Sequence, residues 1–257
     1  MLSQHVLQVA GVSKRFGGLQ ALNDVHLNIE RGQVYGLIGP NGAGKTTFFN
    51  VITGLYPADS GNFVLADQPY QPKDVHLVAK AGIARTFQNI RLFADMTALE
   101  NVMVARHVRT HSGLLGAIFR TKSFTQEEKE IAERAHELLA YVGIDTLADV
   151  KARTLSYGDQ RRLEIARALA TDPQLLALDE PAAGMNATEK VQLRTLIDKI
   201  RHDQRTVLLI EHDVKLVMGL CDRVTVLDEG QVIAEGTPAH VQRDARVMQA
   251  YLGTAQV

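Results

Sequence analysis

The sequence predicts an α/β fold in which a parallel core sheet carries an antiparallel β subdomain and a helical subdomain. Three observations predict it. Short apolar runs at residues 34–38, 175–178 and 207–210 have the length and composition of buried parallel strands. Residues 6–9 and 22–29 read as further short strands, and the second of them alternates apolar with polar side chains. From residue 89 to about residue 157 the apolar residues change to helical spacing.

Length and composition limit the class of protein. The chain has 257 residues, which suits one large domain or two closely joined ones. Its 28 Lys and Arg balance 29 Asp and Glu, so the overall charge indicates no nucleic-acid partner. The apolar runs are far shorter than a bilayer span and the first residues lack a signal-peptide pattern, so we expect a soluble, cytoplasmic protein. The single cysteine, Cys221, excludes an internal disulfide and is expected to line the core.

The most informative stretch is a glycine-rich loop between an expected strand and an expected helix. It fits the pattern GxxxxGK followed by Ser or Thr, with the residues Gly39, Pro40, Asn41, Gly42, Ala43, Gly44, Lys45, Thr46 and Thr47. Glycines let successive backbone N–H groups turn toward a phosphate, and the following helix adds the positive end of its dipole. Lys45 then supplies a charge for the β- and γ-phosphates, and Thr46 a hydroxyl for Mg²⁺. The alternative is a glycine-rich turn with a solvated lysine.

An aromatic residue, Phe16, precedes a Gly-Gly turn upstream of this loop. Because an aromatic face beside a phosphate site can stack on a purine base, Phe16 is a candidate adenine platform. The alternative is that Phe16 packs into the small antiparallel sheet.

Polar side chains follow three of the expected core strands. Gln88 ends the strand at residues 83–87, Asp179 and Glu180 follow the run at 175–178, and His212 follows the run at 207–210. Ligands of α/β proteins bind beyond the carboxyl ends of parallel strands, so these four side chains are candidates for one site. Asp179 is placed to hold Mg²⁺ and Glu180 to polarise a water. Each has an ordinary alternative as a surface amide, a helix-capping acid or a solvated histidine.

The helical region carries its own local signals. Two capping boxes are predicted, Thr97 with Glu100 and Thr125 with Glu128, and Gly143 stands where a helix would end.

Two further stretches of this region are candidates for contacts with other molecules. In residues 106–122, four Lys and Arg residues surround the apolar residues Leu114, Leu115, Ala117, Ile118 and Phe119, and the segment contains no acid. This segment either packs within its own domain or lies at a membrane, against another protein or an anionic lipid surface. Ser156 and Gly158 form a turn before a helix, which indicates either a second anion site or a helix N-cap.

The changes of pattern divide the chain into four parts. Residues 1–88 are expected to form the first part of the nucleotide-binding core, with the antiparallel β subdomain and the phosphate loop. Residues 89–158 form the helical subdomain with the Ser156 turn, residues 159–236 the second part of the core, and residues 237–257 a helical tail.

With these pieces in this order, the chain resembles the ATP-binding subunits of ABC transporters over essentially its whole length. The resemblance rests on the loop at 39–47, Gln88, the signature-like stretch 155–160, the strand ending in Asp179 and Glu180, and His212. It implies a P-loop NTPase (RecA-like) fold, ATP and Mg²⁺ as cofactors, and ATP hydrolysis coupled to transmembrane transport. It also implies a head-to-tail dimer with a second ATP-binding subunit, identical or paralogous.

The same resemblance implies roles for single residues. Glu180 would be the general base, His212 the γ-phosphate contact, and Gln88 the link between Mg²⁺, the attacking water and the membrane subunits. Thr46, Gln88 and Asp179 would hold Mg²⁺, while Ser156 and Gly158 would contact the partner subunit's ATP. The implied partners are integral membrane permease subunits and, indirectly, a solute-binding protein. The chain would then lie peripherally on the cytoplasmic face of the inner membrane.

More narrowly, the chain resembles the ATPases of branched-chain (hydrophobic) amino acid importers. This rests on the residues after the signature, on stretches 181–186 and 211–218, on the basic and apolar insertion near Gly113, and on the ending at 250–253. An importer ATPase for urea, amides or another solute is one alternative. Another is a soluble ABC ATPase that acts on ribosomes or DNA, although such chains usually carry two nucleotide domains or a coiled-coil insertion.

The chain departs from the family pattern in two places. The common signature LSGGQ reads LSYGDQ, with Tyr157 and Asp159 as the changed residues. Where the family usually has SALD, residues 183–186 place the amide Asn186 at a carboxylate position expected to bridge two sites. These departures leave the coupling between the two sites of a dimer open.

Overall fold

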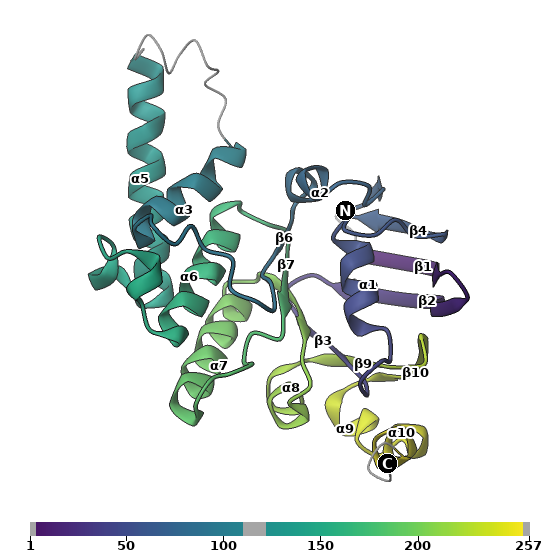
Figure 1. Ribbon diagram of the computed structural model, residues 1–257. Helices are drawn as coiled ribbons and strands as arrows, with labels where there is room; N and C mark the ends of the chain where they lie inside the picture. Colours follow the sequence, from purple (N-terminus) through teal and green to yellow (C-terminus); the bar gives the residue numbers. More distant parts are fainter. Residues whose placement is uncertain (1–3, 110–121, 254–257) are drawn as a thin grey trace. The chain divides into compact units, whose positions relative to one another are not determined.

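The computed structural model describes residues 4–109 and 122–253, which form two compact units (Figure 1). The first unit combines Met1–Gln88 with Gln174–Val257, and the second is Asn89–Pro173.

A six-stranded sheet forms the core of the first unit, with the strand order β10-β9-β3-β8-β7-β6. Its strands are β3 (Val34–Ile38), β6 (Ile83–Arg85), β7 (Leu175–Asp179), β8 (Thr206–Ile210), β9 (Arg223–Asp228) and β10 (Gln231–Gly236). All neighbours are parallel except β10, which pairs with β9 in the antiparallel sense. Every residue of β3, β7 and β8 is buried, which is why their sequences are continuous apolar runs.

A four-stranded antiparallel sheet shares the apolar core of this unit. Its order is β2-β1-β4-β5, with β1 (His5–Phe16), β2 (Leu19–Glu30), β4 (Ser60–Leu65) and β5 (Gln68–Tyr70). The short strands predicted at 6–9 and 22–29 are part of a much longer hairpin, in which Phe16 pairs with Leu19 across the turn. Register shifts interrupt the pairing after Val9, and such bulges break the apolar alternation from which strand ends are predicted.

The helices of the first unit begin and end at local signals. They are α1 (Lys45–Ile52), α2 (Val75–Ala81), α7 (Ala187–His202), α8 (Val214–Leu220), α9 (Pro238–Val241) and α10 (Ala245–Gly253). Thr237 caps α9 and Pro238 occupies its first turn, but the predicted continuous tail is divided into α9 and α10. Cys221 is buried, as predicted. No helix within the described residues is long and apolar enough to cross a membrane.

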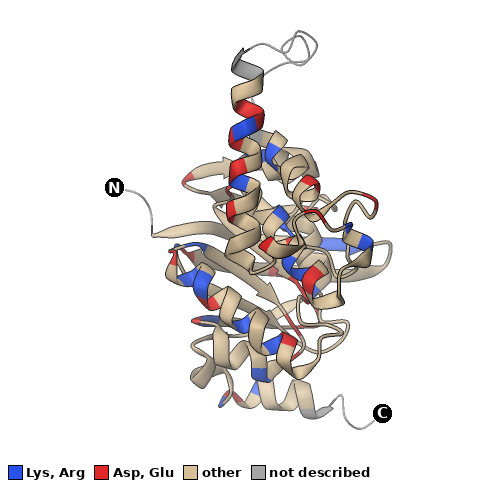
Figure 2. Cartoon of the chain, turned by 90° about the vertical axis from the view of Figure 1, so that its left-hand side faces the viewer, with Lys and Arg blue, Asp and Glu red and all other residues tan. Residues whose placement is uncertain are grey.

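The second unit is helical. It contains α3 (Ala98–Arg106), α5 (Lys122–Val142), α6 (Tyr157–Ala170) and short 3₁₀ turns at His107–Arg109, Asp145–Leu147 and Ala152–Thr154. The three α-helices pack on one another, which brings α6 into this unit and extends it to Pro173 instead of residue 158. Acidic and basic residues both occur along α5 (Figure 2), and include the pairs Lys129 with Glu133 and Arg134 with Glu137.

Two of the three local signals in this unit are confirmed. Thr97 and Glu100 form the predicted capping box, and Gly143 ends α5 with φ of 77°. The box predicted at Thr125 and Glu128 is wrong, because α5 already begins at Lys122 and Thr125 lies inside the helix. Most of the basic and apolar segment 106–122 lies outside the described residues.

Candidate active site

The glycine loop joins β3 to α1, and its backbone conformation requires glycine. Gly39, Gly42 and Gly44 have φ of 154°, 82° and 99°. A Cβ atom on Gly39 would lie 2.1 Å from the Leu227 carbonyl oxygen, and one on Gly44 would lie 2.7 Å from the Ala21 carbonyl oxygen. Gly44 caps α1 without a side-chain hydrogen bond, so the first turn of α1 presents backbone N–H groups as an anion site does.

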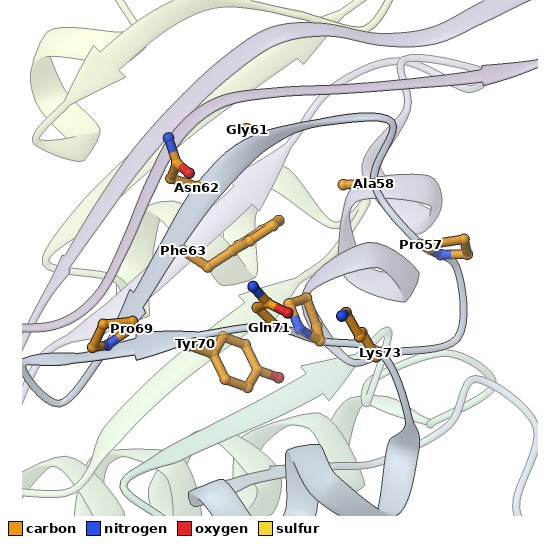
Figure 3. Close-up of a pocket in the computed structure, with 10 residues that line it drawn as sticks. Pro57, Ala58, Gly61, Asn62, Phe63, Pro69, Tyr70, Gln71 and Lys73 are labelled. Carbon is orange, nitrogen blue, oxygen red and sulfur yellow. The ribbon is translucent and has the colours of Figure 1, made fainter.

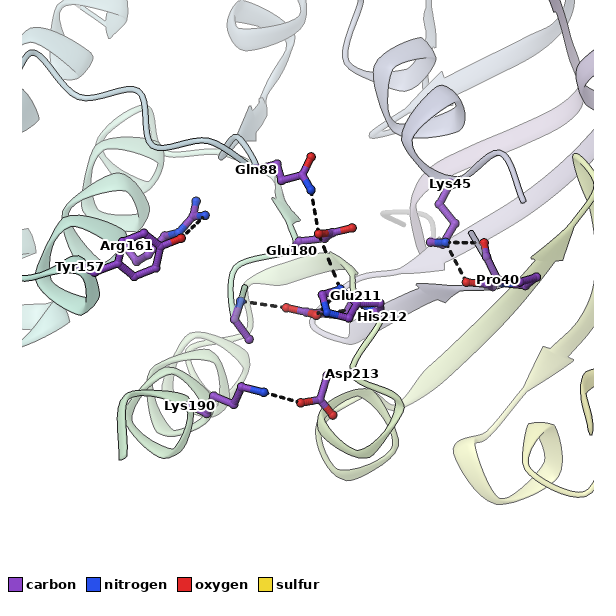
Figure 4. A network of polar contacts seen from close by, with 12 residues as sticks. Pro40, Lys45, Gln88, Tyr157, Arg161, Glu180, Lys190, Glu211, His212 and Asp213 are labelled. Atoms are coloured by element: carbon purple, nitrogen blue, oxygen red, sulfur yellow. Dashed lines mark hydrogen bonds and ion pairs between the residues drawn. The ribbon is translucent and has the colours of Figure 1, made fainter. Parts of the chain in front are cut away.

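Lys45 lies across this loop. It is 7% exposed, and its ammonium group donates to the carbonyl oxygens of Gly39 at 2.7 Å and Pro40 at 2.8 Å (Figure 4). Burial lowers the pKa of Lys45, and the Glu180 carboxylate acts in the opposite direction. The loop therefore holds a positive charge next to its own N–H groups, in the arrangement that a phosphate requires.

A pocket of 690 Å³ opens beside the loop. Its lining includes Phe16, Gln20, Lys45, Thr46 and Glu229. Phe16 is 42% exposed rather than buried in the antiparallel sheet, and its ring meets Tyr56 edge to face at 5.3 Å. The pocket is large enough for a small organic ligand, and it places an aromatic face and a phosphate-binding loop in one cavity.

Three of the predicted polar side chains meet beyond the ends of neighbouring strands. The Glu180 carboxylate accepts a hydrogen bond from the Gln88 side-chain amide at 2.9 Å, and it lies 3.6 Å from His212 Nδ1 (Figure 4). The side chain of Glu180 is 20% exposed and that of His212 is 59% exposed. A partly buried carboxylate with two polar neighbours and access to solvent can orient a water molecule and accept its proton.

Glu180 also has an unusual backbone. Its φ is 46°, in the left-handed region, which costs a residue other than glycine about 1–2 kcal/mol. Its N–H donates to the Ile210 carbonyl at 2.9 Å, and its own carbonyl accepts from Ala183 at 3.1 Å. Left-handed residues held by their surroundings are concentrated at active sites, and this one carries the candidate base.

Asp179, the last residue of β7, is 5% exposed. Its carboxylate lies 3.9 Å from the guanidinium group of Arg85, a residue to which sequence reasoning gave no role. Arg85 lies between the rings of Phe49 and Phe87, at 4.6 and 4.4 Å, and donates to Thr53 Oγ1 at 2.6 Å. The available signal was a single cation in the expected strand at residues 83–87, three residues before Gln88.

The donor set fits Mg²⁺. No group of three or more His, Cys, Asp or Glu residues in the described chain could hold a metal ion by itself. The predicted ligands are instead the Thr46 hydroxyl, the Asp179 carboxylate and the Gln88 amide, which are all hard oxygen donors. Mg²⁺ in nucleotide sites takes few protein ligands and completes its shell with phosphate oxygens and water.

Ser156 and Gly158 belong to the helical unit, whereas the site residues described above belong to the first unit. Ser156 caps α6: its oxygen accepts from the Asp159 N–H at 3.2 Å, and its hydroxyl donates to the Asp159 carboxylate at 2.6 Å. Asp159 also accepts from Arg162 at 2.7 Å, and the Tyr157 hydroxyl accepts from Arg161 at 2.9 Å. Each changed signature residue is therefore bonded to an arginine of the same helix.

Asn186 has a structural role at the start of a helix. It caps α7 and forms a capping box with Glu189, accepting from the Glu189 N–H at 3.0 Å while its own N–H donates to the Glu189 carboxylate at 2.9 Å. Asn is among the preferred N-cap residues.

A second pocket, of 340 Å³, lies along β4 and β5 (Figure 3). Its lining includes three prolines and the rings of Phe63 and Tyr70, which meet edge to face at 6.3 Å. The Tyr70 hydroxyl is already bonded to the Ile52 carbonyl at 2.9 Å. The lining contains no acid and no glycine loop, so it offers neither a base nor a phosphate cradle. The candidate site is therefore the one around Lys45 and Glu180.

Comparison with known proteins gives two family matches. The model of the ABC transporter family matches residues 22–183, more than half of the chain. The model described as branched-chain amino acid ATP-binding cassette transporter matches residues 231–257.

Among curated proteins, the chain is 47% identical to the high-affinity branched-chain amino acid transport ATP-binding protein BraF of Pseudomonas aeruginosa. It is 46% identical to the corresponding protein LivG of Escherichia coli K12. Both matches cover 99% of this chain and 100% of the relative. The lipopolysaccharide export system ATP-binding protein LptB of the same E. coli strain is 33% identical, over 96% of this chain and 97% of LptB.

Solved structures agree with these matches and confirm the predicted fold class. The ADP conformation of MJ1267, an ATP-binding cassette of an ABC transporter, has a TM-score of 0.84 and 32% identity, covering 98% of this chain and 100% of MJ1267. A dimeric cassette, MJ0796 bound to ADP and Pi, has a TM-score of 0.75 and 27% identity, covering 90% of this chain and 98% of MJ0796. The chain is thus a nucleotide-binding member of the ABC transporter family, and it resembles the ATP-binding proteins of branched-chain amino acid transport.

Proposed function

We propose that this chain is the subunit that hydrolyses ATP to drive an importer of branched-chain or other hydrophobic amino acids. The observation that carries the hydrolytic part is the Glu180 carboxylate, which is bonded to Gln88 and lies beside His212 in the same unit as the Lys45 loop.

In this proposal each residue performs a step that its position supports. The loop N–H groups and Lys45 bind the β- and γ-phosphates, and Phe16 stacks on the adenine. Glu180 orients the attacking water and accepts its proton, while His212 contacts the γ-phosphate. Mg²⁺, held by Thr46, Asp179 and Gln88, would neutralise charge on the β- and γ-phosphates.

A second ATP-binding subunit is part of the proposal. Ser156 and Gly158 lie at the N-terminal end of α6, where a helix favours an anion. They belong to the helical unit rather than to the unit that holds Lys45, and the related cassette MJ0796 forms a dimer with ADP and Pi. We therefore assign Ser156 and Gly158 to the partner subunit's ATP. The remaining proposed partners are permease subunits and, through them, a solute-binding protein, which places this chain peripherally on the cytoplasmic face of the membrane.

The proposed cargo follows from similarity. Relatives named for branched-chain amino acid transport are 36–47% identical over nearly the whole chain, and the bacterial ones are 45–47% identical, while the export protein LptB is 33% identical. The separate match at residues 231–257 points the same way. An importer of urea or amides remains the competing proposal, because an ATP-binding subunit does not contact the solute.

Replacing Glu180 with Gln tests the hydrolytic role. The amide keeps the shape of the side chain and cannot accept a proton, so ATP turnover should fall by roughly two to four powers of ten while ATP still binds. An ATP-bound dimer should then accumulate on size-exclusion chromatography. Glu133→Gln is the matched control, because it removes the same charge from an exposed position on α5 and should leave turnover unchanged. Wild-type turnover in the Glu180 variant would show that the base is elsewhere.

The cargo is tested separately. The chain is co-expressed with its permease subunits, and the complex is reconstituted in vesicles with the solute-binding protein. Leucine should stimulate ATP hydrolysis and accumulate in the vesicles, whereas urea should do neither. Stimulation by urea alone would replace the proposed cargo and leave the hydrolytic role intact.

A further inference from the structure

Glu211 is a buried carboxyl group to which the mechanism above gives no role. It follows β8, directly before His212, and is 0% exposed. Burial raises its pKa, as expected for an acid moved away from water. Acidic residues are almost never fully buried unless they are paired, and the ion-pair neighbour of Glu211 in the described chain is His212, whose Nδ1 lies 3.9 Å away. Burying a carboxyl group costs free energy. A buried carboxyl is therefore expected to do something that an apolar side chain cannot do.

The contacts of Glu211 join two separate backbone segments. Its Oε1 accepts from the Ala182 N–H at 2.8 Å, and its Oε2 accepts from the His212 N–H at 3.2 Å (Figure 4). One side chain therefore connects the turn that follows the candidate base with the turn that carries the candidate γ-phosphate contact.

Both segments border the candidate base. Ala182 lies two residues after Glu180, whose backbone is in the left-handed region, and the turn continues through the Met185 N–H bond to the Ala182 carbonyl at 3.2 Å. On the other side, His212 Nδ1 lies 3.6 Å from the Glu180 carboxylate. The hydrogen bonds of Glu211, the backbone from Glu180 to Ala182 and the contact between Glu180 and His212 therefore form a closed ring.

We propose that Glu211 is a positioning residue that holds Glu180 and His212 at their working separation by fixing both backbone turns. This inference rests on the proposed hydrolytic function. A carboxylate suits the task because both of its oxygens accept hydrogen bonds. A glutamine could accept from Ala182, but its amide nitrogen would face the His212 N–H, donor against donor.

Two variants test the proposal. Glu211→Gln breaks the link on the His212 side, and Glu211→Met breaks the links on both sides. Each should lower kcat about ten- to hundredfold, because misplacement of a catalytic group by about 1 Å has effects of that size. The KM for ATP should stay within about twofold, because the Lys45 loop is untouched. Glu164→Gln is the control for stability, since Glu164 is another buried carboxyl whose pKa burial raises.

A double-mutant cycle separates positioning from a general structural effect. If Glu211 acts through Glu180, then adding Glu211→Gln to Glu180→Gln should change the residual turnover less than about twofold. Unchanged kcat in the single variants, or full additivity in the cycle, would overturn the proposal. So would a parallel loss of kcat, ATP affinity and melting temperature in both Glu211 variants. A wild-type chain that fails to hydrolyse ATP would instead refute the proposed function, and the inference with it.

Discussion

The left-handed backbone of Glu180 leads to a stability prediction that is independent of catalysis. Its φ of 46° costs a side-chain-bearing residue about 1–2 kcal/mol, and glycine avoids that cost. Glycine in turn loses about 0.5–1 kcal/mol more conformational entropy on folding than alanine does. The difference predicts that Glu180→Gly is more stable than Glu180→Ala by about 0.8 kcal/mol, within a range of about 0–1.5 kcal/mol. Both variants lack the carboxylate, so the comparison isolates the backbone.

Thermal unfolding measures this difference. For a chain of this size, 1 kcal/mol corresponds to a shift of about 2–4 °C, so Glu180→Gly should melt about 2–3 °C above Glu180→Ala. Neither variant should hydrolyse ATP at an appreciable rate. The matched control is Gln204, another left-handed residue, with φ of 57°, in the turn between α7 and β8. Gln204→Gly should likewise melt above Gln204→Ala, with hydrolysis retained in both.

One pattern of results would refute the reasoning. If the Gln204 pair shows the gain and the Glu180 pair shows none, then Glu180 is not held in the left-handed region in solution. The inference that its conformation is maintained by the surrounding turn would fail with it.

Two further predictions concern ligand affinity and pH. Lys45→Ala should weaken binding of a fluorescent ATP analogue by the monomer about tenfold or more, because it removes a charge-assisted contact. Ser156→Ala should leave that affinity unchanged. Equal losses of affinity in the two variants would refute the assignment of Ser156 to the partner's ATP. The hydrogen bond from Lys190 lowers the pKa of Asp213, so the stability from this pair is present above the unfolded-state pKa and is lost as the pH falls through the folded-state value. Asp213→Asn should therefore have a lower urea midpoint than wild type at about pH 7, and the difference should shrink toward about pH 3. A difference independent of pH would show that the stability comes from some other contact of Asp213.

The sequence predicted the elements whose signals are local. The strands β3, β7 and β8 are continuous apolar runs because both faces of the sheet are covered, and the glycine loop is recognisable because its backbone excludes other residues. The long hairpin of β1 and β2 was underestimated, since bulges interrupt the alternation that marks a strand. The boundary of the helical unit was misplaced because α6 belongs to it through packing on α3 and α5, which no local pattern records.

The candidate site was predicted unevenly for the same reason. Glu180 and His212 follow apolar runs and Gln88 follows a third expected strand, and the carboxyl ends of parallel strands lie at one edge of a sheet, so the sequence placed all three in one site. Arg85 and Glu211 contact residues far away in the chain. The ring of Phe49 beside Arg85 and the N–H of Ala182 beside Glu211 become visible only once the strands are paired.

The order of the strands also has a consequence for biosynthesis. The central strand β3, which leads into the phosphate loop, pairs with β8 and β9, so that Val34 meets Val207 and Tyr35 meets Arg223. A chain emerging from the ribosome can close the β1–β2 hairpin early, but β3 has no neighbour in its own sheet until nearly the whole protein has been made. Nascent fragments therefore lack the completed loop and the strand ends that hold Glu180 and His212. The nucleotide site is therefore among the last parts of the chain to form during synthesis.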